Sequence, residues 1–576
     1  MPTRVALFLA CLLFAAPVLA QEGRLSVTLE APEALRPLLE RHVRLLRTEQ
    51  AVPERIADRI ALIRRSRRDI GGLLATEGYF TPVIDFEREA PERWRIVVDP
   101  GPRATIAATD IRFEGHLAGD GEEAAARRER LRAAWTLQAG QPFRQSDWDA
   151  AKQSLLYEVS TRDYATARIA ASRAEVDAEA ALVRLSVSVD SGPPFRIGAL
   201  EVRGIERLPA DFVARYSNLR EGEPFDRERL LALQGSLQNL PQLASVSVDI
   251  PRDPALADAV PVRVQVSEAE SRRLSLGAGY STNTGMRAEL GWRDVNLFDR
   301  GWELETGLRL EQRRQSLFAD IFLPPTRDNV RDSFGAMADA SDIEGLRTDR
   351  YAIGAVRAWT FGDDETALSL RYQRERLRPD GADDATNKAL TASVSWTRRR
   401  VDNPLDPRSG YVLRGEIGGG AKSLLSDQDF LRLYARAAHY LPVGNDTLIL
   451  RGELGATLAD SRDGIPLDYL FRTGGSQSVR GYDYESLGVK EGDATLGGRY
   501  LATASAEYIH WFRPQWGVAS FIDIGDAADS RRDFDAKVGI GVGARWRSPA
   551  GPIALDLAYG HDDQRFRLHF SVAIAF

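Results

Sequence analysis

The stretch Arg565-Phe566-Arg567-Leu568-His569-Phe570-Ser571-Val572-Ala573-Ile574-Ala575-Phe576 decides the fold, because a large apolar side chain occupies every second position along it. A period of two places these side chains on one face of a β-strand. The opposite face starts with Arg565 and Arg567 and is mostly polar or small. A tilted strand of about 9–11 residues crosses a lipid bilayer. This segment is therefore long enough to be a membrane-spanning strand.

The same alternation of apolar and polar residues recurs in the chain before this strand, as far back as residue 270. Alternating segments such as 273–280, 366–372 and 390–396 are separated by clusters of Gly, Asp, Asn and Pro. Each segment alone also fits a half-buried strand of a soluble sandwich, but so long a soluble β-array normally divides into smaller domains. We therefore expect residues 270–576 to form a transmembrane β-barrel, and their spacing favours sixteen antiparallel strands.

The chain before residue 270 mixes helical and strand patterns and contains a repeat. Asp99–Pro102 reappears as Asp190–Pro193, and Gly140–Phe143 reappears as Gly222–Phe225, in the same order. Ordered self-similarity of this kind indicates an array of small domains. We expect three α+β units, each with the order strand, helix, helix, strand, strand. Their ranges are 22–100, 101–191 and 192–268.

The first residues predict a secretory signal peptide, residues 1–20. Arg4 precedes an apolar run from Val5 to Pro17, and cleavage is expected after Ala20. The run is shorter than the roughly 17–25 residues of a spanning helix. The single cysteine, Cys11, lies inside the run, which makes a lipoprotein anchor the weaker alternative.

Composition argues against several function classes. The chain has 76 basic and 83 acidic residues, so its net charge of −7 gives no electrostatic case for nucleic-acid binding. Its six histidines show no metal-ligand spacing, and there is no G-x-S-x-G elbow and no Walker A loop. We expect no catalytic residues, no metal and no cofactor, and we predict that the protein is not an enzyme.

Four motifs in the barrel half resemble the outer-membrane assembly-factor superfamily. They are Val479-Arg480-Gly481-Tyr482, Phe521-Ile522-Asp523-Ile524-Gly525, Asp402-Asn403-Pro404-Leu405-Asp406-Pro407, and Gly541-Val542-Gly543-Ala544-Arg545-Trp546. The repeats resemble the polypeptide-transport-associated (POTRA) domains of that superfamily. With three such units the chain is most similar to the translocation and assembly module branch. The sister BamA family carries five POTRA units, and two-partner secretion transporters typically carry two.

This resemblance implies a location and a function. It implies an outer-membrane barrel of a bacterial cell with its POTRA domains in the periplasm. The implied activity is the assembly or translocation of unfolded outer-membrane protein clients, such as autotransporters, into outer-membrane lipid. The implied partner is an inner-membrane-anchored TamB-like protein that docks on the POTRA domains. A two-partner-secretion-type transporter and a passive porin are the alternatives.

The resemblance also implies a lumen site. Val479, Arg480, Gly481 and Tyr482 would tip an extracellular loop that folds back into the barrel. Arg480 would pair with Asp523 of the barrel-wall motif, because a lone enclosed charge is costly. The other wall residues are Phe521 and Gly525, and both Gly481 and Gly525 would allow close backbone approach. The alternative is an ordinary surface turn with a solvated Arg480.

A second implied site is a lateral seam between the first barrel strand, near residues 272–281, and the last strand. The residues assigned to the seam are Leu274, Leu276, Phe570, Val572, Ile574 and Phe576. A weak join there would part and offer a strand edge to a client by β-augmentation. A short apolar wall would also thin the bilayer. We expect a disulfide between Leu276 and Ile574, or a near neighbour, to block client insertion.

Overall fold

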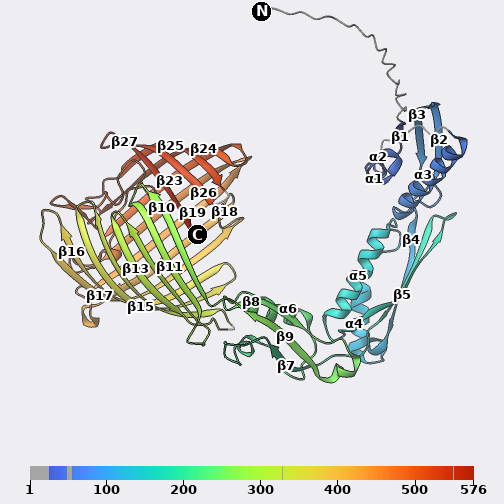
Figure 1. The fold of residues 1–576 in the computed structure, drawn as a ribbon, viewed down its shortest axis with the longest axis horizontal. Helices are drawn as coiled ribbons and strands as arrows, with labels where there is room; N and C mark the ends of the chain where they lie inside the picture. Colours follow the sequence, from blue (N-terminus) through green and yellow to red (C-terminus); the bar gives the residue numbers. More distant parts are fainter. Residues whose placement is uncertain (1–24, 48–54, 327, 549–550, 576) are drawn as a thin grey trace, which may run out of the picture. The chain divides into compact units, whose positions relative to one another are not determined.

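The computed structural model describes residues 25–47, 55–326, 328–548 and 551–575. The predicted signal peptide, Cys11 and Phe576 lie outside these residues. No helix in the described ranges has both the length and the apolar character needed to cross a membrane. The fold class expected from the sequence is confirmed, because three small α+β sheets precede a barrel of sixteen antiparallel strands (Figure 1).

The chain divides into two compact units. The first holds the residues up to 199 together with 219–230 and 249–262. The second holds residues 200–218, 231–248 and 263–576. The third α+β sheet therefore contributes residues to both units.

The first α+β sheet packs three strands against helices. Its elements are β1 (Ser26–Glu30), α1 (Arg36–His42), α2 (Arg44–Arg47), α3 (Ile56–Thr76), β2 (Val83–Ala90) and β3 (Arg93–Asp99). The strand order is β1-β3-β2, with β1 parallel and β2 antiparallel to β3. Ile70 and Leu74 are four residues apart on one face of α3, and they share an apolar cluster with Ile96 of the central strand.

The second α+β sheet repeats this topology. Its elements are β4 (Thr105–Glu114), α4 (Glu122–Ala133), α5 (Gln145–Thr161), β5 (Arg168–Asp177) and β6 (Leu182–Asp190). The order is β4-β6-β5, again with the first strand parallel to the central one. Val183, Leu185, Val187 and Val189 alternate along β6 and are all buried. A period of two on the central strand therefore builds the core of this sheet.

The third α+β sheet departs from the expected order. Its elements are β7 (Ile197–Arg203), α6 (Arg227–Gln238), β8 (Leu243–Asp249) and β9 (Val260–Glu268), in the order β7-β9-β8. Two helices were expected between the first two strands, and this prediction is wrong for the described residues. In place of the first helix stands a single 3₁₀ turn, η2 (Ala214–Tyr216). Pro209 lies inside the segment 204–226 that joins β7 to α6, and a proline in a helix interior removes a backbone hydrogen bond, so no helix continues through it.

The end of β9 binds the loop that follows β7. Glu268 Oε1 accepts hydrogen bonds from the backbone N–H groups of Glu206, Arg207 and Leu208, each at 2.9 Å. Burial raises the pKa of Glu268, but the three hydrogen bonds outweigh it and hold the pKa below its ordinary value. The carboxylate therefore stabilises this loop.

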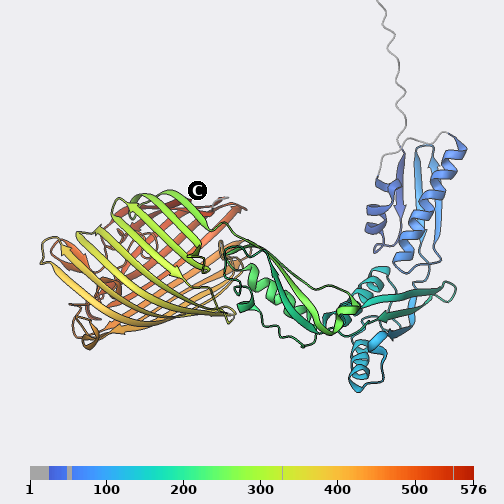
Figure 2. The same cartoon turned by 60° about the horizontal axis from the view of Figure 1, so that its bottom comes forward.

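Sixteen strands form the barrel, and each pairs antiparallel with the next (Figure 2). They are β10 (Arg272–Ser281), β11 (Gly285–Leu297), β12 (Trp302–Glu311), β13 (Arg314–Phe322), β14 (Val330–Ile343), β15 (Leu346–Phe361), β16 (Asp364–Pro379), β17 (Ala385–Val401), β18 (Gly410–Gly420), β19 (Phe430–Val443), β20 (Asp446–Leu458), β23 (Tyr500–Arg513), β24 (Trp516–Ala528), β25 (Lys537–Ser548), β26 (Gly551–Gly560) and β27 (Arg565–Ala575). The segment between β20 and β23 carries a small hairpin, β21 (Val489–Glu491) and β22 (Ala494–Leu496). The ladder between β27 and β10 closes the barrel.

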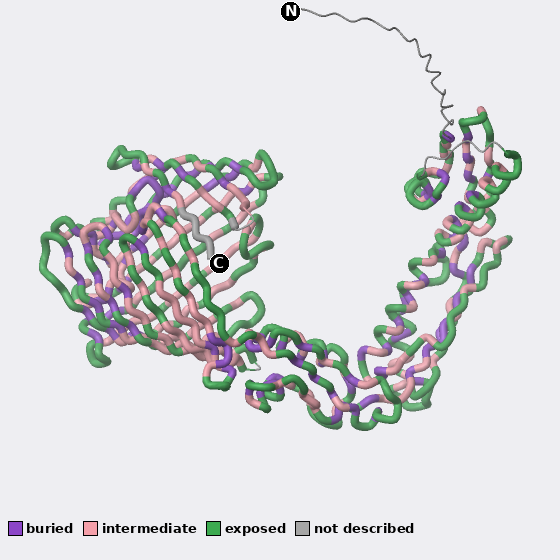
Figure 3. The backbone as a smooth tube through the Cα atoms, in the orientation of Figure 1, coloured by how far each residue is buried: buried purple, intermediate pink, exposed green. Residues whose placement is uncertain are grey.

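The barrel wall is apolar outside and polar inside. Along β16, Leu368 and Leu370 are exposed on the outer face, whereas Gln373 and Glu375 are buried on the inner face. Exposed and less exposed residues alternate along the barrel strands in Figure 3. This alternation is the pattern of a membrane-embedded barrel with a polar lumen.

The turn between β11 and β12 contacts loops of the third α+β sheet. Arg207 Nη2 lies 3.0 Å from Asp299 Oδ1, and Gln242 Nε2 donates to the carbonyl of Gly301 at 2.7 Å. Gly301 has φ +69°, and a Cβ there would lie 2.5 Å from the ring of Phe212. These contacts identify the end of the barrel that faces the third sheet.

Candidate functional site

The segment between β20 and β23, here named the lumen loop (residues 459–499), contacts opposite parts of the barrel wall. On one side, the Leu467 N–H donates to Glu375 of β16 at 2.8 Å, and the Tyr469 and Thr391 hydroxyls are 2.7 Å apart. On the other side, Arg480 bonds to residues of β23, β24 and β26. Because β16 and β17 lie roughly opposite these strands in the strand order, the loop crosses the lumen.

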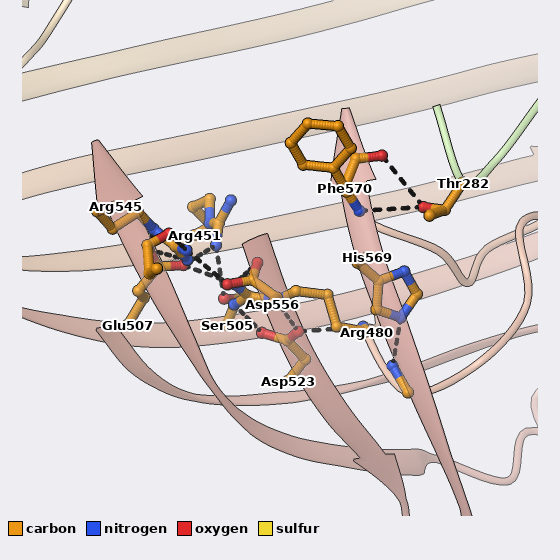
Figure 4. A network of polar contacts seen from close by, with 12 residues as sticks. Thr282, Arg451, Arg480, Ser505, Glu507, Asp523, Arg545, Asp556, His569 and Phe570 are labelled. Atoms are coloured by element: carbon orange, nitrogen blue, oxygen red, sulfur yellow. Dashed lines mark hydrogen bonds and ion pairs between the residues drawn. The ribbon is translucent and has the colours of Figure 1, made fainter. Parts of the chain in front are cut away.

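Arg480 occupies the centre of a buried ion cluster (Figure 4). Its Nε and Nη2 donate to the two carboxylate oxygens of Asp523 at 2.7 and 2.9 Å, and its backbone N–H donates at 3.1 Å. Nη1 donates to Glu507 at 2.7 Å and to Asp556 at 3.2 Å. The guanidinium carbon lies 3.4 Å from the centre of the Phe521 ring. Two parallel hydrogen bonds to one carboxylate fix both the position and the direction of the arginine.

Two further arginines balance the carboxylates of this cluster. Arg545 of β25 donates to Glu507 Oε1 at 3.0 and 2.8 Å and to Asp556 Oδ1 at 2.5 Å. Arg451 of β20 donates to Glu507 Oε2 at 2.9 Å. The cluster thus matches three guanidinium groups with three carboxylates, which avoids the large cost of an unpaired buried charge. In the described part of the chain no group of His, Cys, Asp and Glu side chains could hold a metal ion.

Glycines make room for the tip of the lumen loop. Gly481 has φ +97°, and a Cβ there would lie 2.8 Å from the backbone nitrogen of Gly560. A Cβ at Gly539 of β25 would clash with the carbonyl of Arg480. Gly525, for which the resemblance implied a close approach, instead faces a carbonyl of the neighbouring strand β23. The loop therefore approaches the wall at Gly539 and Gly560, because only residues without a Cβ fit there.

The last strand holds the loop tip directly. The Gly481 N–H donates to His569 Nε2 at 3.0 Å, and Arg567 Nη1 donates to the Gly481 carbonyl at 2.6 Å. The Tyr482 hydroxyl donates to Asp562, in the turn before β27, at 2.7 Å. Val479 and Tyr482 are both buried. All four residues of the loop motif are therefore enclosed, and three of them bond to the carboxy-terminal strands or to the turn before β27.

The seam between β10 and β27 is a short ladder. Residues 277–281 pair with residues 571–575, which makes five pairs. Among the described residues, all the other ladders of the barrel are longer. The next shortest joins β26 and β27 and has seven pairs. Just beyond the ladder, the Thr282 N–H donates to the Phe570 carbonyl at 2.9 Å, and the Phe570 N–H donates to Thr282 Oγ1 at 3.2 Å (Figure 4).

The assigned seam residues occupy different places in this ladder. Leu274 and Leu276 pair only with β11 in the described residues, and their side chains are 62% and 55% exposed. The residue opposite Ile574 is Ala278, two positions from Leu276. Val572 lies within the ladder, and Phe576 lies outside the described residues. In the described part of the chain, the ladder between β10 and β27 therefore begins at Gly277, whereas the ladder between β10 and β11 begins at Arg272.

Comparison with protein families matches residues 271–576 to the Omp85 superfamily domain. The chain belongs to the Omp85 superfamily. It is 26% identical over 418 residues to the outer membrane protein assembly factor BamA of Nitratidesulfovibrio vulgaris, which covers 68% of this chain and 52% of that protein. It is 24% identical over 415 residues to BamA of Neisseria meningitidis serogroup B, which covers 65% of this chain and 51% of that protein. This Omp85 chain spans about half the length of the curated relatives it matches.

A solved structure shows the same fold. The crystal structure of BamA from Haemophilus ducreyi lacking POTRA domains 1–3 matches this Omp85 chain with a TM-score of 0.71 at 16% identity. The match covers 80% of this chain and 99% of that structure. As a member of the Omp85 superfamily related to an outer membrane protein assembly factor, this chain has its barrel in the outer membrane and its POTRA-like sheets in the periplasm. Membership of the Omp85 superfamily also confirms that the chain is not an enzyme.

Sequence reasoning pointed to Arg480 and Asp523 of this Omp85 barrel, and the structure brings the two side chains together. It gave Arg545 only as part of a motif, and it missed Glu507, Asp556 and Arg451, which complete the cluster. The only sequence signal for these residues was that each is a charged residue at an inward-facing position of a membrane-spanning strand. Many lumen positions of a barrel carry charges, so this signal does not single out these three.

Proposed function

We propose that this Omp85 chain assembles outer-membrane proteins by admitting client strands at the seam between β10 and β27. The single observation that carries the proposal is the ladder between β10 and β27, which has five pairs in the described residues, fewer than any other ladder of the barrel there. A strand entering lipid must pair its backbone groups. An open strand edge supplies that pairing by β-augmentation, largely regardless of side-chain sequence.

In this proposal the lumen loop holds one side of the seam still. Val479, Arg480, Gly481 and Tyr482 anchor the loop to the carboxy-terminal strands, and Phe521 and Asp523 form its wall. His569 and Arg567 of β27 bond to Gly481. The last strand is therefore bonded to the lumen loop directly, whereas on the other side of the seam the loop is bonded to the turn after β10, where Asn283 Nδ2 donates to Ser476 Oγ at 3.1 Å. The first strand is the one that moves when the seam opens.

A disulfide across the seam tests the proposal. In A278C/I574C the two cysteines face each other across the ladder. The matched control A278C/A288C keeps the same cysteine on β10 but joins it to β11. Each protein is placed in liposomes, and insertion of an unfolded outer-membrane barrel protein is followed under oxidising and reducing conditions. We expect oxidation to abolish insertion only in A278C/I574C and reduction to restore it. Full insertion by the oxidised seam variant would refute the proposal.

We further propose that the chain is the TamA-like subunit of a translocation and assembly module. In this proposal residues 22–100, 101–191 and 192–268 are POTRA domains that bind an inner-membrane-anchored TamB-like protein, and residues 270–576 are the barrel. Autotransporters would be among its clients. The three POTRA-like sheets, each with the first strand at an edge, support this proposal, because sheet edges bind extended partners.

Affinity purification from cell envelopes tests the partner. The full chain should capture an inner-membrane-anchored protein, and deletion of residues 25–100 should lose it while the barrel still folds. Recovery of the chain without any inner-membrane protein would refute the partner proposal but would leave the seam proposal standing.

A further inference from the structure

The outer wall of the barrel between β13 and β16 is hollowed by a groove of about 690 Å³. Leu317 borders it on one side, and Tyr351 and Ile353 border it on the other. These three side chains are 53%, 63% and 60% exposed, so the groove opens on the outer face. The floor consists of small residues that face outward in register with these walls. They are Ala319, Ala336 and Ala338.

One end of this groove carries two cations. Arg374 of β16 lines the groove and lies opposite Tyr351 in β15 and Lys388 in β17. Directly opposite residues of an antiparallel pair share a face. Arg374 and Lys388 are therefore adjacent on the outer surface, and both are exposed. Within the described residues Arg374 has no carboxylate partner, and the nearest to Lys388 is Asp427 at 3.8 Å.

Other outward-facing arginines of β15 to β17 each have a carboxylate partner. Arg347 pairs with Asp342 at 2.9 Å, and Arg376 pairs with Asp384 at 2.8 Å. The remaining pairs are Arg357 with Asp332, Arg378 with Asp349, Arg398 with Asp364, and Arg400 with Asp363. In the described part of these three strands, Arg374 is the outward arginine whose charge no side chain balances.

The position of Arg374 is the extracellular boundary of the apolar band. The turn between β11 and β12 lies at the periplasmic end, next to the third sheet, so β16 runs from the periplasm outward. Trp359 and Trp396 flank Thr366, eight positions before Arg374. Eight residues at about 3.3 Å each and a tilt of about 40° rise roughly 20 Å, close to the apolar height of a barrel. Arg374 and Lys388 therefore lie at the headgroups of the outer leaflet, beside Tyr351.

We propose that Arg374, Lys388 and the alanine-floored groove form a binding site for a phosphorylated, acylated lipid of the outer leaflet. The phosphate lies between the two cations, where the guanidinium fork matches its oxygens. One acyl chain lies along the groove between Leu317 and Ile353. Charge complementarity favours a phosphorylated lipid, because an arginine without a carboxylate partner beside a lysine attracts an anionic headgroup. The apolar groove favours a ligand with an acyl chain over a free, hydrated anion.

The site lies on β13 to β17, on the opposite side of the barrel from the seam in the strand order. It is therefore separate from the proposed client site, and its failure would not affect that proposal. A lipid bound there would hold the wall opposite the moving strand.

Lipid retention tests the site. Wild type and R374Q/K388Q are placed in phosphatidylcholine nanodiscs that contain a small fraction of diphosphoryl lipid A, and retained lipid A is counted by native mass spectrometry. Each cation near an anionic lipid contributes about 1 kcal/mol, so losing two costs about 2 kcal/mol and we expect roughly thirtyfold less retention in the variant. The matched control R347Q/R376Q removes the same charge from carboxylate-paired arginines at the same boundary and should retain lipid A like wild type.

A second variant separates the lipid site from a bare anion site. Ala336→Phe fills the groove floor and leaves both cations in place, so it should also lose lipid A. The heat-dependent gel mobility of the barrel checks that every variant is folded. Equal retention by wild type and R374Q/K388Q would refute phosphate recognition. Wild-type retention by A336F, or an equal loss in R347Q/R376Q, would refute the lipid site.

Discussion

Replacing Arg480 by methionine removes the guanidinium and keeps much of the side-chain volume. The variant leaves Asp523, a fully buried carboxylate, without its cation. It also removes the contacts at 2.7 and 3.2 Å to Glu507 and Asp556. Removing one partner of a buried ion pair costs about 3–5 kcal/mol. At about 1.4 kcal/mol per factor of ten, the ratio of docked to undocked lumen loop should fall by roughly two to three orders of magnitude.

Cysteine labelling measures this change. Val479 is fully buried in the docked loop, so the labelling rate of V479C by a maleimide reports the undocked fraction. We expect V479C/R480M to label at least about a hundredfold faster than V479C. The control V479C/R309Q loses a half-exposed wall ion pair, Arg309 with Glu289, which is worth about 1 kcal/mol or less. Equal labelling of V479C and V479C/R480M would refute the docking role of Arg480.

Three further predictions follow from the same structure. Gly481→Ala should loosen the loop tip by about 1–3 kcal/mol and raise V479C labelling, whereas Gly444→Ala, with φ +62° and open space around it, should not raise labelling. Because the pKa of Glu268 is held below its ordinary value, its stabilisation is present above about pH 4.3 and is lost as the pH falls through the folded-state pKa. E268Q should remove this dependence, as hydrogen exchange of residues 206–208 will show. In planar bilayers R480M should conduct more than wild type, since the lumen loop crosses the lumen, and equal conductance would contradict that arrangement.

The fold was largely predictable because its signals are local. Alternation along strands such as β17 and β27 requires only neighbouring residues, and the repeat before residue 270 requires only counting. The exception was the third sheet, where the segment that contains Pro209 forms one 3₁₀ turn instead of a helix. The helices of the two preceding units do not indicate whether the third unit also forms a helix at this place.

The candidate site was only partly predictable because it depends on register between distant strands. The pairing of Arg480 with Asp523 came from a motif resemblance. Glu507 and Asp556 join them only because β23, β24 and β26 bring their inward faces to the same depth. Likewise, the strand pattern alone does not say that Ala278, and not Leu276, faces Ile574. A register shift of two residues leaves every side chain on the same face of the strand. The alternating pattern within one strand therefore cannot distinguish the two registers.

The carboxylates that bind Arg480 all come later in the chain than Arg480 itself. Asp523, Glu507 and Asp556 belong to strands that leave the ribosome, and reach the periplasm, after the lumen loop. During its own biogenesis the barrel therefore carries an unmatched arginine until its final strands arrive. Engagement of that arginine by all three carboxylates requires strands as late as β26, so a chain truncated before β23 would leave Arg480 unmatched and should remain open to proteolysis.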